Sequence, residues 1–178
     1  MRPRHFLLTL GLAALPLPAM AQQMEQHTMG MAAVRPLYQS VKGWLIASAE
    51  QMPEDKYSYQ PTPEVRNFAE LMGHVAESNF IFCSAAAGEQ NPNSTEFEKV
   101  TSKSEMVAGV KAAFEYCDAA FEMTEAKAME ETTFFGQTGS RLWVLMYNVA
   151  HDWEHYGNVV TYMRLNGLVP PSSQRGGM

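Results

Sequence analysis

The amino-acid sequence predicts an all-α protein folded as a four-helix bundle. Apolar residues recur at spacings of three and four over four segments of about twenty residues each. Residues typical of helix starts and stops bound these segments, and no segment carries a convincing strand pattern. Four amphipathic helices without a sheet must bury their apolar faces against one another, which favours a bundle.

Local start and stop signals place each helix. Pro53, Gly88 and Gly167 follow three of the apolar segments, and none of them readily continues a helix. Ser102 and Glu105 form a capping-box pattern, in which the hydroxyl and the carboxylate each accept a first-turn N–H. The four helices are expected at residues 33–52, 67–87, 102–124 and 140–166.

The first 21 residues have the build of a secretory signal peptide. Arg2 and Arg4 precede an apolar run from Phe6 to Leu17, and the cleavage pattern Ala-x-Ala ends at Ala21. The run is much shorter than the roughly 20 residues of a spanning helix. We expect cleavage after Ala21 and a periplasmic or secreted product with no stable membrane span after processing; the alternative is an uncleaved N-terminal anchor.

The rest of the chain is long enough for one domain with a sizeable core. The expected organisation is a signal peptide, a flexible tail, a bundle and a C-terminal tail, at residues 1–21, 22–32, 33–171 and 172–178. All 19 acidic residues but only 11 of the 13 basic residues follow the cleavage point, so the mature chain carries a net charge of −8. Such a surface repels phosphate backbones, and no nucleic-acid partner is expected.

The chain has two cysteines, Cys83 and Cys117. An exported protein permits a disulfide between them. If the second and third helices formed an antiparallel hairpin, the two residues would lie about 7 Å and about 22 Å from its shared end. This arrangement predicts two buried free thiols, with a disulfide as the alternative.

The stretch HDWEHYG, residues His151 to Gly157, places two histidines four residues apart on the last helix. Their side chains project within about 40° of each other, one turn apart, so both can reach one ion. The apolar stripe of this helix is expected to face roughly the opposite side, which makes the histidine face either a solvated surface or the wall of a polar pocket. The stripe comprises Leu142, Leu145, Val149, Trp153, Tyr156, Val160 and Met163.

A third histidine strengthens the hypothesis of a metal site. His74, on the second helix, is the only other histidine within the expected bundle. Taken alone it is better explained as a satisfied core histidine. Three histidines at ligand spacing on two helices instead favour a divalent ion with open positions for water and Lewis-acid chemistry. The alternative is that all three are incidental to function.

The last helix also contains the pattern H-x-x-E-H, which is the signature of inverted zinc metalloproteases. Those enzymes need a further acidic ligand well downstream. No Asp or Glu follows His155, and the domain is small for their usual substrate cleft. The protease interpretation is therefore rejected.

Two longer motifs resemble the DinB-like (YfiT-like) family of small bacterial proteins. They are P-x-P-E-V-R-x-F-A-E-L-M-G-H-V-A-E-S-N at residues 61–79 and H-x-x-x-H-Y-G-N-x-x-x-Y-M-R-L-N-G-L-V-P-P at residues 151–171. The resemblance implies a four-helix bundle with a long crossover connection. It also implies a metal bound by His74, His151 and His155, with zinc or nickel expected first and iron or manganese as further options.

The family resemblance further implies a metal-dependent hydrolase or a thiol transferase. Two features depart from its pattern. Asn158 stands where many relatives have Gln, which alters the pocket but leaves the three ligands in place. The thiol-transferase branch uses low-molecular-weight thiols of the cytoplasm, whereas this chain is expected to be exported.

The leading hypothesis is an exported metalloprotein that holds a divalent ion through the three histidines; if it is an enzyme, it is expected to hydrolyse a small electrophilic substrate. Glu77, Asp152 and Glu154 are the candidate proton carriers or acceptors for imidazole N–H groups, and each is equally well explained as a solvated helix charge. The alternative is a bundle that binds a metal or small ligand without turnover. The resemblance also allows a homodimer, although no surface for one is evident.

Overall fold

The computed structural model describes residues 29–174 and confirms the four-helix bundle. The predicted signal peptide and residues 22–28 lie outside the described residues, as do residues 175–178. The long helices are α2 (Met29–Gln51), α3 (Phe68–Ala87), α4 (Lys103–Phe121) and α6 (Arg141–Leu165). Within residues 29–174, no helix is both long and apolar enough to cross a membrane.

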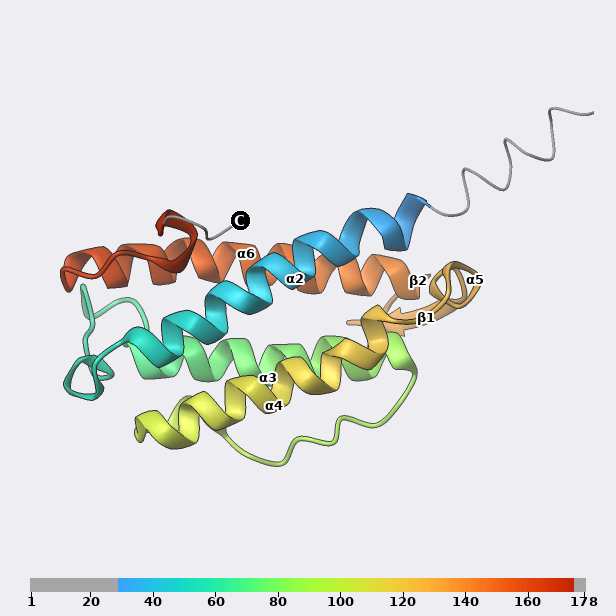
Figure 1. The fold of residues 1–178 in the computed structure, drawn as a ribbon. Coiled ribbons are helices and arrows are strands. Elements are labelled where there is room, and N and C mark those ends of the chain that lie inside the picture. The colour runs from blue at the N-terminus through green and yellow to red at the C-terminus, as the bar shows by residue number, and fades with distance from the viewer. Residues whose placement is uncertain (1–28, 175–178) are drawn as a thin grey trace, which may run out of the picture.

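The connection between α3 and α4 determines the topology. Residues 88–102 run the length of the bundle, from the end of α3 back to the level of its start, and carry the short 3-10 helix η2 (Phe97–Lys99) (Figure 1). Consequently α3 and α4 run parallel to each other, while α2 and α6 run in the opposite direction (Figure 1). The long crossover expected from the resemblance is present.

Capping residues begin and end the helices close to the predicted positions. The Asn67 side chain accepts the N–H of Glu70, and the Glu70 carboxylate accepts the N–H of Asn67, which completes a capping box at α3. At α4 the hydroxyl of Ser102 accepts the N–H of Glu105, so this half of the predicted box is present. Gly88 ends α3 in the left-handed region, with φ 76°.

The first helix begins at Met29, four residues before its expected start. The carboxylate of Glu125 accepts the N–H groups of Gly30 and Met31 at 3.1 and 2.9 Å, so it satisfies two donors that a helix N-terminus leaves free. Glu125 begins the four-residue helix α5 (Glu125–Ala128). This contact between distant segments orders residues that the sequence places in a flexible tail.

The expectation of no strand is wrong. Strands β1 (Glu131–Phe134) and β2 (Gln137–Ser140) form an antiparallel hairpin before α6. Phe135 and Gly136 make its two-residue turn with φ of 48° and 74°, the signs of a type I′ turn. Each strand has only four residues and no apolar alternation, so the periodicity that identifies strands was absent.

The prediction of free thiols is also wrong, because Cys83 and Cys117 form a disulfide that joins α3 to α4. Their Cα atoms lie 5.3 Å apart and both side chains are fully buried. Cys83 lies 15 residues after the start of α3, and Cys117 lies 14 residues after the start of α4. In parallel helices these positions are level with each other, whereas the antiparallel hairpin assumed above would separate them.

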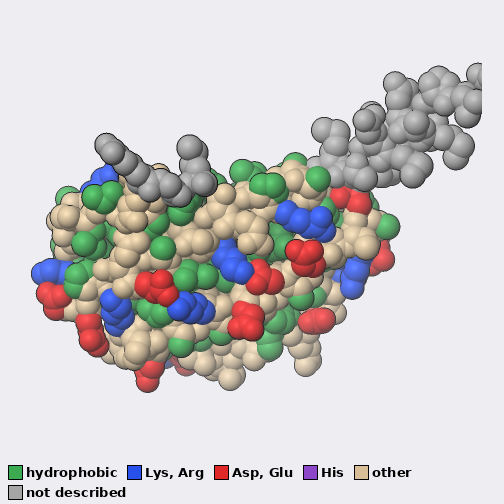
Figure 2. All heavy atoms as spheres, in the orientation of Figure 1, with side chains coloured by type: hydrophobic (Ala, Val, Ile, Leu, Met, Phe, Trp, Pro, Cys, Tyr) green, Lys and Arg blue, Asp and Glu red, His purple; other side chains and the backbone are tan. Residues whose placement is uncertain are grey.

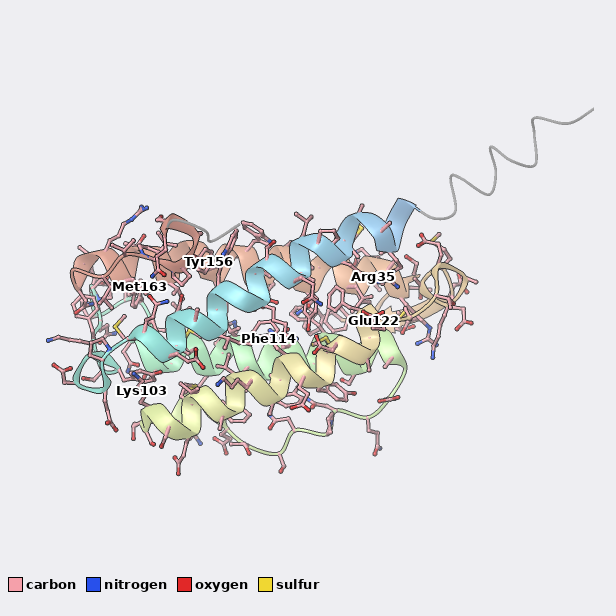
Figure 3. All side chains as sticks on the ribbon, in the orientation of Figure 1. Arg35, Lys103, Phe114, Glu122, Tyr156 and Met163 are labelled. Atoms are coloured by element: carbon pink, nitrogen blue, oxygen red, sulfur yellow. A yellow bond between two sulfur atoms is a disulfide. The ribbon has the colours of Figure 1, made fainter. Side chains whose placement is uncertain are left out.

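Two basic side chains, Arg35 and Lys103, join helices at opposite ends of the bundle (Figure 3). Each donates hydrogen bonds to free backbone carbonyls at the end of a helix. Arg35 donates to the carbonyls of Phe121 and Met123 at 2.6 and 2.8 Å, where α4 ends. Lys103 donates to two carbonyls at the end of α2, at 2.7 and 2.8 Å. On the face shown in Figure 2, acidic and basic side chains are interspersed among polar and apolar ones.

Candidate metal centre

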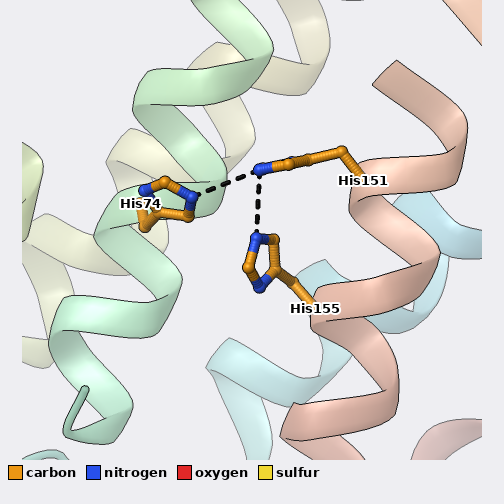
Figure 4. A group of neighbouring side chains, drawn as sticks. All are labelled: His74, His151 and His155. Carbon is orange, nitrogen blue, oxygen red and sulfur yellow. Dashed lines mark hydrogen bonds between the residues drawn. The ribbon is translucent and has the colours of Figure 1, made fainter. Parts of the chain in front are cut away.

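Two helices bring the three predicted histidines together. His74 projects from α3, and His151 and His155 project from α6 (Figure 4). The Nε2 atom of His151 lies 3.2 Å from Nε2 of His74 and 3.0 Å from Nε2 of His155. One ring nitrogen from each residue lies within 4.8 Å of those from the other two. The three histidines therefore lie close enough together to hold one metal ion.

The glycine before His74 allows the crossover to approach α3. A side-chain Cβ at Gly73 would clash with the backbone of Phe97 and Glu98 in η2. On α4, Gly109 leaves room for the ring of Phe97 in the same way. These two glycines let η2 pack closely on the bundle beside His74.

Glu98, which η2 carries, orients the first histidine. Its Oε1 atom lies 2.8 Å from Nδ1 of His74, while Arg66 donates to both of its carboxylate oxygens at 3.2 and 3.3 Å. A carboxylate at Nδ1 holds the ring in one orientation and keeps the proton there, which leaves Nε2 free for a metal. Glu98 is not among the predicted site residues, because nothing in the sequence of the polar crossover marks it as a neighbour of α3.

The electrostatic environment keeps the α6 histidines neutral. Burial, together with the neighbouring His155 and His74, lowers the pKa of His151 to about 3. Burial, with a further contribution from His74, also lowers the pKa of His155. Burial alone would raise the pKa of Glu98, but its hydrogen bonds from Arg66 and His74 prevail and lower it. At neutral pH the site therefore presents neutral imidazoles at His151 and His155 and an ionised carboxylate at Glu98.

The three candidate acids occupy different environments. Asp152 is fully buried and accepts a hydrogen bond from Nδ2 of Asn79 at 2.9 Å, and burial raises the pKa of its carboxyl group well above the usual range. Glu77 is half-buried and accepts the backbone N–H of Glu98 at 3.0 Å. Glu154 is exposed and lines the same cavity as His155. Asp152 is thus no solvated helix charge.

The buried side of α6 is broader than the predicted apolar stripe. It includes Asn148, Asp152 and His155, with Asn148 donating to Oδ1 of Asn79 at 3.1 Å. By contrast Trp153, which was assigned to the stripe, is exposed. Asn148, His151 and His155 therefore form the wall of a polar site, whereas Tyr147, Glu154 and Asn158 on the same side of α6 are exposed.

A cavity of about 890 Å³ opens beside His155, the member of the histidine group that lines it. The loop that precedes α3 forms one wall, and residues of α6 form the other, including His155, Asn158 and Tyr162. The hydroxyl of Tyr162 donates to the backbone carbonyl of Arg66 at 2.6 Å, which ties the two walls together. This volume falls within the range of sites that bind small molecules.

The donor set fits a divalent ion. Two imidazole nitrogens bound tetrahedrally at about 2.0–2.1 Å lie about 3.3 Å apart, which is close to the separations of 3.2 and 3.0 Å found here. Neutral imidazoles suit zinc, nickel and iron. Among the described residues, Nδ1 of His151 and Nδ1 of His155 are buried without a hydrogen-bond partner, so only His74 has an orienting acceptor.

Comparisons with known proteins agree with this architecture. A DinB-like protein from Bacillus cereus has a similar structure, with a TM-score of 0.67 and 17% sequence identity over 75% of this chain and 91% of that chain. A DinB-like protein from Bacillus subtilis gives a TM-score of 0.61 and 23% identity, over 86% of this chain and 99% of that chain. A comparison with curated proteins found no match. The family model of the DinB superfamily matches residues 41–159, about two thirds of the sequence, and the chain therefore belongs to the DinB superfamily.

Proposed function

We propose that this protein is an exported metal-dependent hydrolase that acts on a small electrophilic substrate such as an ester or amide. The observation that carries the proposal is the convergence of three imidazoles beside a cavity large enough for a small molecule. His74, His151 and His155 would hold a divalent ion, with zinc or nickel first and iron or manganese next. When bound, such an ion polarises a carbonyl group and acidifies water.

The residues of the chain divide the remaining tasks. Glu98 orients His74 through the hydrogen bond at Nδ1, and burial keeps His151 and His155 neutral. In hydrolysis the water oxygen bonds to the carbonyl carbon, the bond to the leaving alcohol or amine breaks, and a proton passes from the water to the leaving group. Glu154 is the best placed of the three candidate acids to carry that proton, because it lines the cavity beside His155.

The other two acids have partners that suit structural roles. Glu77 accepts a backbone N–H of the crossover, and Asp152 is fully buried in hydrogen-bonding contact with Asn79. Replacing Glu154 with Gln is therefore expected to reduce kcat without removing the metal. Replacing Glu77 with Gln is the matched control, and it should leave kcat close to that of the parent.

Metal content is the first test. Residues 22–178 would be purified without a histidine tag, and their metal would be measured by mass spectrometry beside the His74→Ala and His155→Ala variants. About one equivalent in the parent, lost in both variants and retained in a His27→Ala control, supports the three-histidine site. A parent that is empty and refuses added zinc and nickel refutes it.

Hydrolysis and export need separate measurements. The metal-loaded chain would be tested against small carboxylic esters and amides; a metal-bound parent that turns over none of them would leave a non-catalytic metal-binding bundle. For export, the full chain would be expressed in a Gram-negative host and the periplasmic protein weighed. A mass that begins at Gln22 supports cleavage after Ala21, and a cytoplasmic protein of full length contradicts it.

A further inference from the structure

A group of three aromatic side chains, two of them exposed, lies beside the candidate metal centre at the hairpin end of α6. The ring centroid of Phe82 is 5.2 Å from that of His151, 5.4 Å from that of Tyr147 and 6.5 Å from that of Phe135. Phe82 is only 4% exposed, whereas Tyr147 is 47% exposed and Phe135 is 72% exposed. We call Phe82, Tyr147 and Phe135 the aromatic shelf.

Folding alone does not explain the position of Phe135. It occupies the first turn position of the hairpin with φ 48°, a conformation that Asn, Asp and Gly adopt far more readily. Its ring contacts that of Phe134, with centroids 4.0 Å apart, but remains mostly exposed, so burial compensates little for this strain. Phe134, which is 6% exposed and packs on Phe82, already anchors the hairpin to the bundle.

The shelf lies within reach of a ligand held at the histidines. Tyr147 precedes His151 by one helical turn, a separation of about 5–6 Å between their Cβ atoms. A benzene ring attached directly to a carbonyl group spans a similar distance. Flat rings pack favourably at centroid distances of about 4.5–7 Å, so a ring attached to a carbonyl group at His151 would lie within packing distance of Tyr147. Phe135 packs on the same Phe82 ring that Tyr147 contacts.

We infer that the aromatic shelf is a substrate subsite that binds the aromatic ring of an aryl ester or aryl amide whose carbonyl group lies at the three histidines. This inference rests on the proposed metal-dependent function and adds the substrate class to it. The cavity beside His155 carries glutamates and Arg66 on its walls, so it suits the polar part of such a molecule. Phe135 and Tyr147 then select for the aromatic ring of the substrate.

Ligand binding tests the subsite without requiring turnover. Residues 22–178 loaded with one equivalent of zinc would be titrated calorimetrically with benzohydroxamate and with acetohydroxamate, two metal-chelating probes that differ in the aromatic ring. We expect benzohydroxamate to bind about tenfold more tightly, and the Phe135→Asn variant to lose about two- to tenfold of that preference. Its affinity for acetohydroxamate should not change.

The Phe135→Asn variant preserves the hairpin because Asn tolerates positive φ in a type I′ turn. Its Tm and zinc content are therefore expected to equal or exceed those of the parent. Val169→Asn is the matched control, because Val169 is 56% exposed and lies after the end of α6, away from the hairpin. This control should keep the full preference for benzohydroxamate.

Equal affinities for the two probes, or a preference that survives Phe135→Asn, would overturn the inference. A parent dimer that Phe135→Asn converts to a monomer, with no change in probe preference, would also overturn it by assigning the shelf to self-association. The proposed hydrolase is tested separately. If the protein prefers benzohydroxamate but hydrolyses no aryl ester, the subsite is supported and the hydrolase is refuted. If it hydrolyses aryl esters but shows no preference between the two probes, the hydrolase is supported and the subsite is refuted.

Discussion

The Cys83–Cys117 disulfide is expected to contribute about 4 kcal/mol to the free energy of unfolding. The two residues are separated by 34 positions in the sequence. Closing a loop of that length in the unfolded chain removes about 13 cal/mol/K of conformational entropy, which is about 4 kcal/mol at 25 °C. Reduction should therefore destabilise the protein mainly by increasing the conformational entropy of the unfolded chain, since the sulfur atoms remain packed between α3 and α4 in the folded state.

Urea unfolding of residues 22–178 with and without reductant measures this contribution. Because both cysteines are fully buried, the protein should be reduced in denaturant and refolded with reductant present. For a domain of this size, 4 kcal/mol corresponds to a decrease in Tm of about 8–15 °C. A chain carrying both Cys83→Ala and Cys117→Ala is the control, and its stability should not respond to reductant.

Two results would refute the reasoning about the disulfide. One is an oxidised and a reduced parent of equal stability. The other is the titration of two free thiols after denaturation of the protein purified without reductant. The first result would refute the stabilising effect of the disulfide, and the second would show the buried free thiols that the sequence predicts.

Three further substitutions test the site and its supports. Glu98→Gln should weaken zinc binding about tenfold, measured by competition with a chelator, because His74 loses its ionised acceptor. Gly73→Ala should destabilise the fold by about 1–3 kcal/mol in urea unfolding and also weaken zinc binding, because the added methyl group meets the backbone of Phe97. Tyr38→Phe should cost about 1–2 kcal/mol at pH 8, because the buried hydroxyl donates to a backbone carbonyl at 2.9 Å. Burial raises the pKa of folded Tyr38 above its ordinary value of 10, so this stabilisation is complete below pH 10 and should shrink as the pH rises toward 11.

Each of these substitutions has a matched control or an opposing outcome. Glu96→Gln removes an exposed acid from the same crossover and should leave zinc affinity unchanged. Gly43→Ala adds a methyl group in open space on α2, so it should be neutral or stabilising. A Tyr38→Phe variant whose deficit is the same at pH 8 and pH 11 would contradict the assigned titration.

The helices and the histidine group could be predicted because their signals are local. Asn67, Ser102 and Gly88 act within one turn of the helix end that they cap, and the sequence shows them directly. His151 and His155 share a helix face by their spacing alone. Placing His74 next to this face required an assumption about the fold, which was that the helices pack as a bundle.

The buried face of α6 was harder to predict, because apolar residues occur on both sides of the helix. Trp153 fits the apolar spacing but is exposed, while Asp152 is fully buried. A buried carboxyl group is rare and needs a partner. Its partner, Asn79, lies on α3 at a distance of 73 residues in the sequence, so helical periodicity could not identify the pair.

The direction of α4 explains both the wrong prediction of free thiols and the failure to predict Glu98 as a neighbour of His74. The crossover returns to the level of the start of α3 before α4 begins. The return places Cys117 level with Cys83, and it also carries Glu98 past His74. An antiparallel hairpin would have given neither contact, and the long crossover implied by the family resemblance was incompatible with the hairpin used to place the cysteines. The same connection therefore stabilises the bundle through the disulfide and completes the environment of the candidate metal centre, which is why a shift of the crossover at Gly73 is expected to affect both stability and zinc binding.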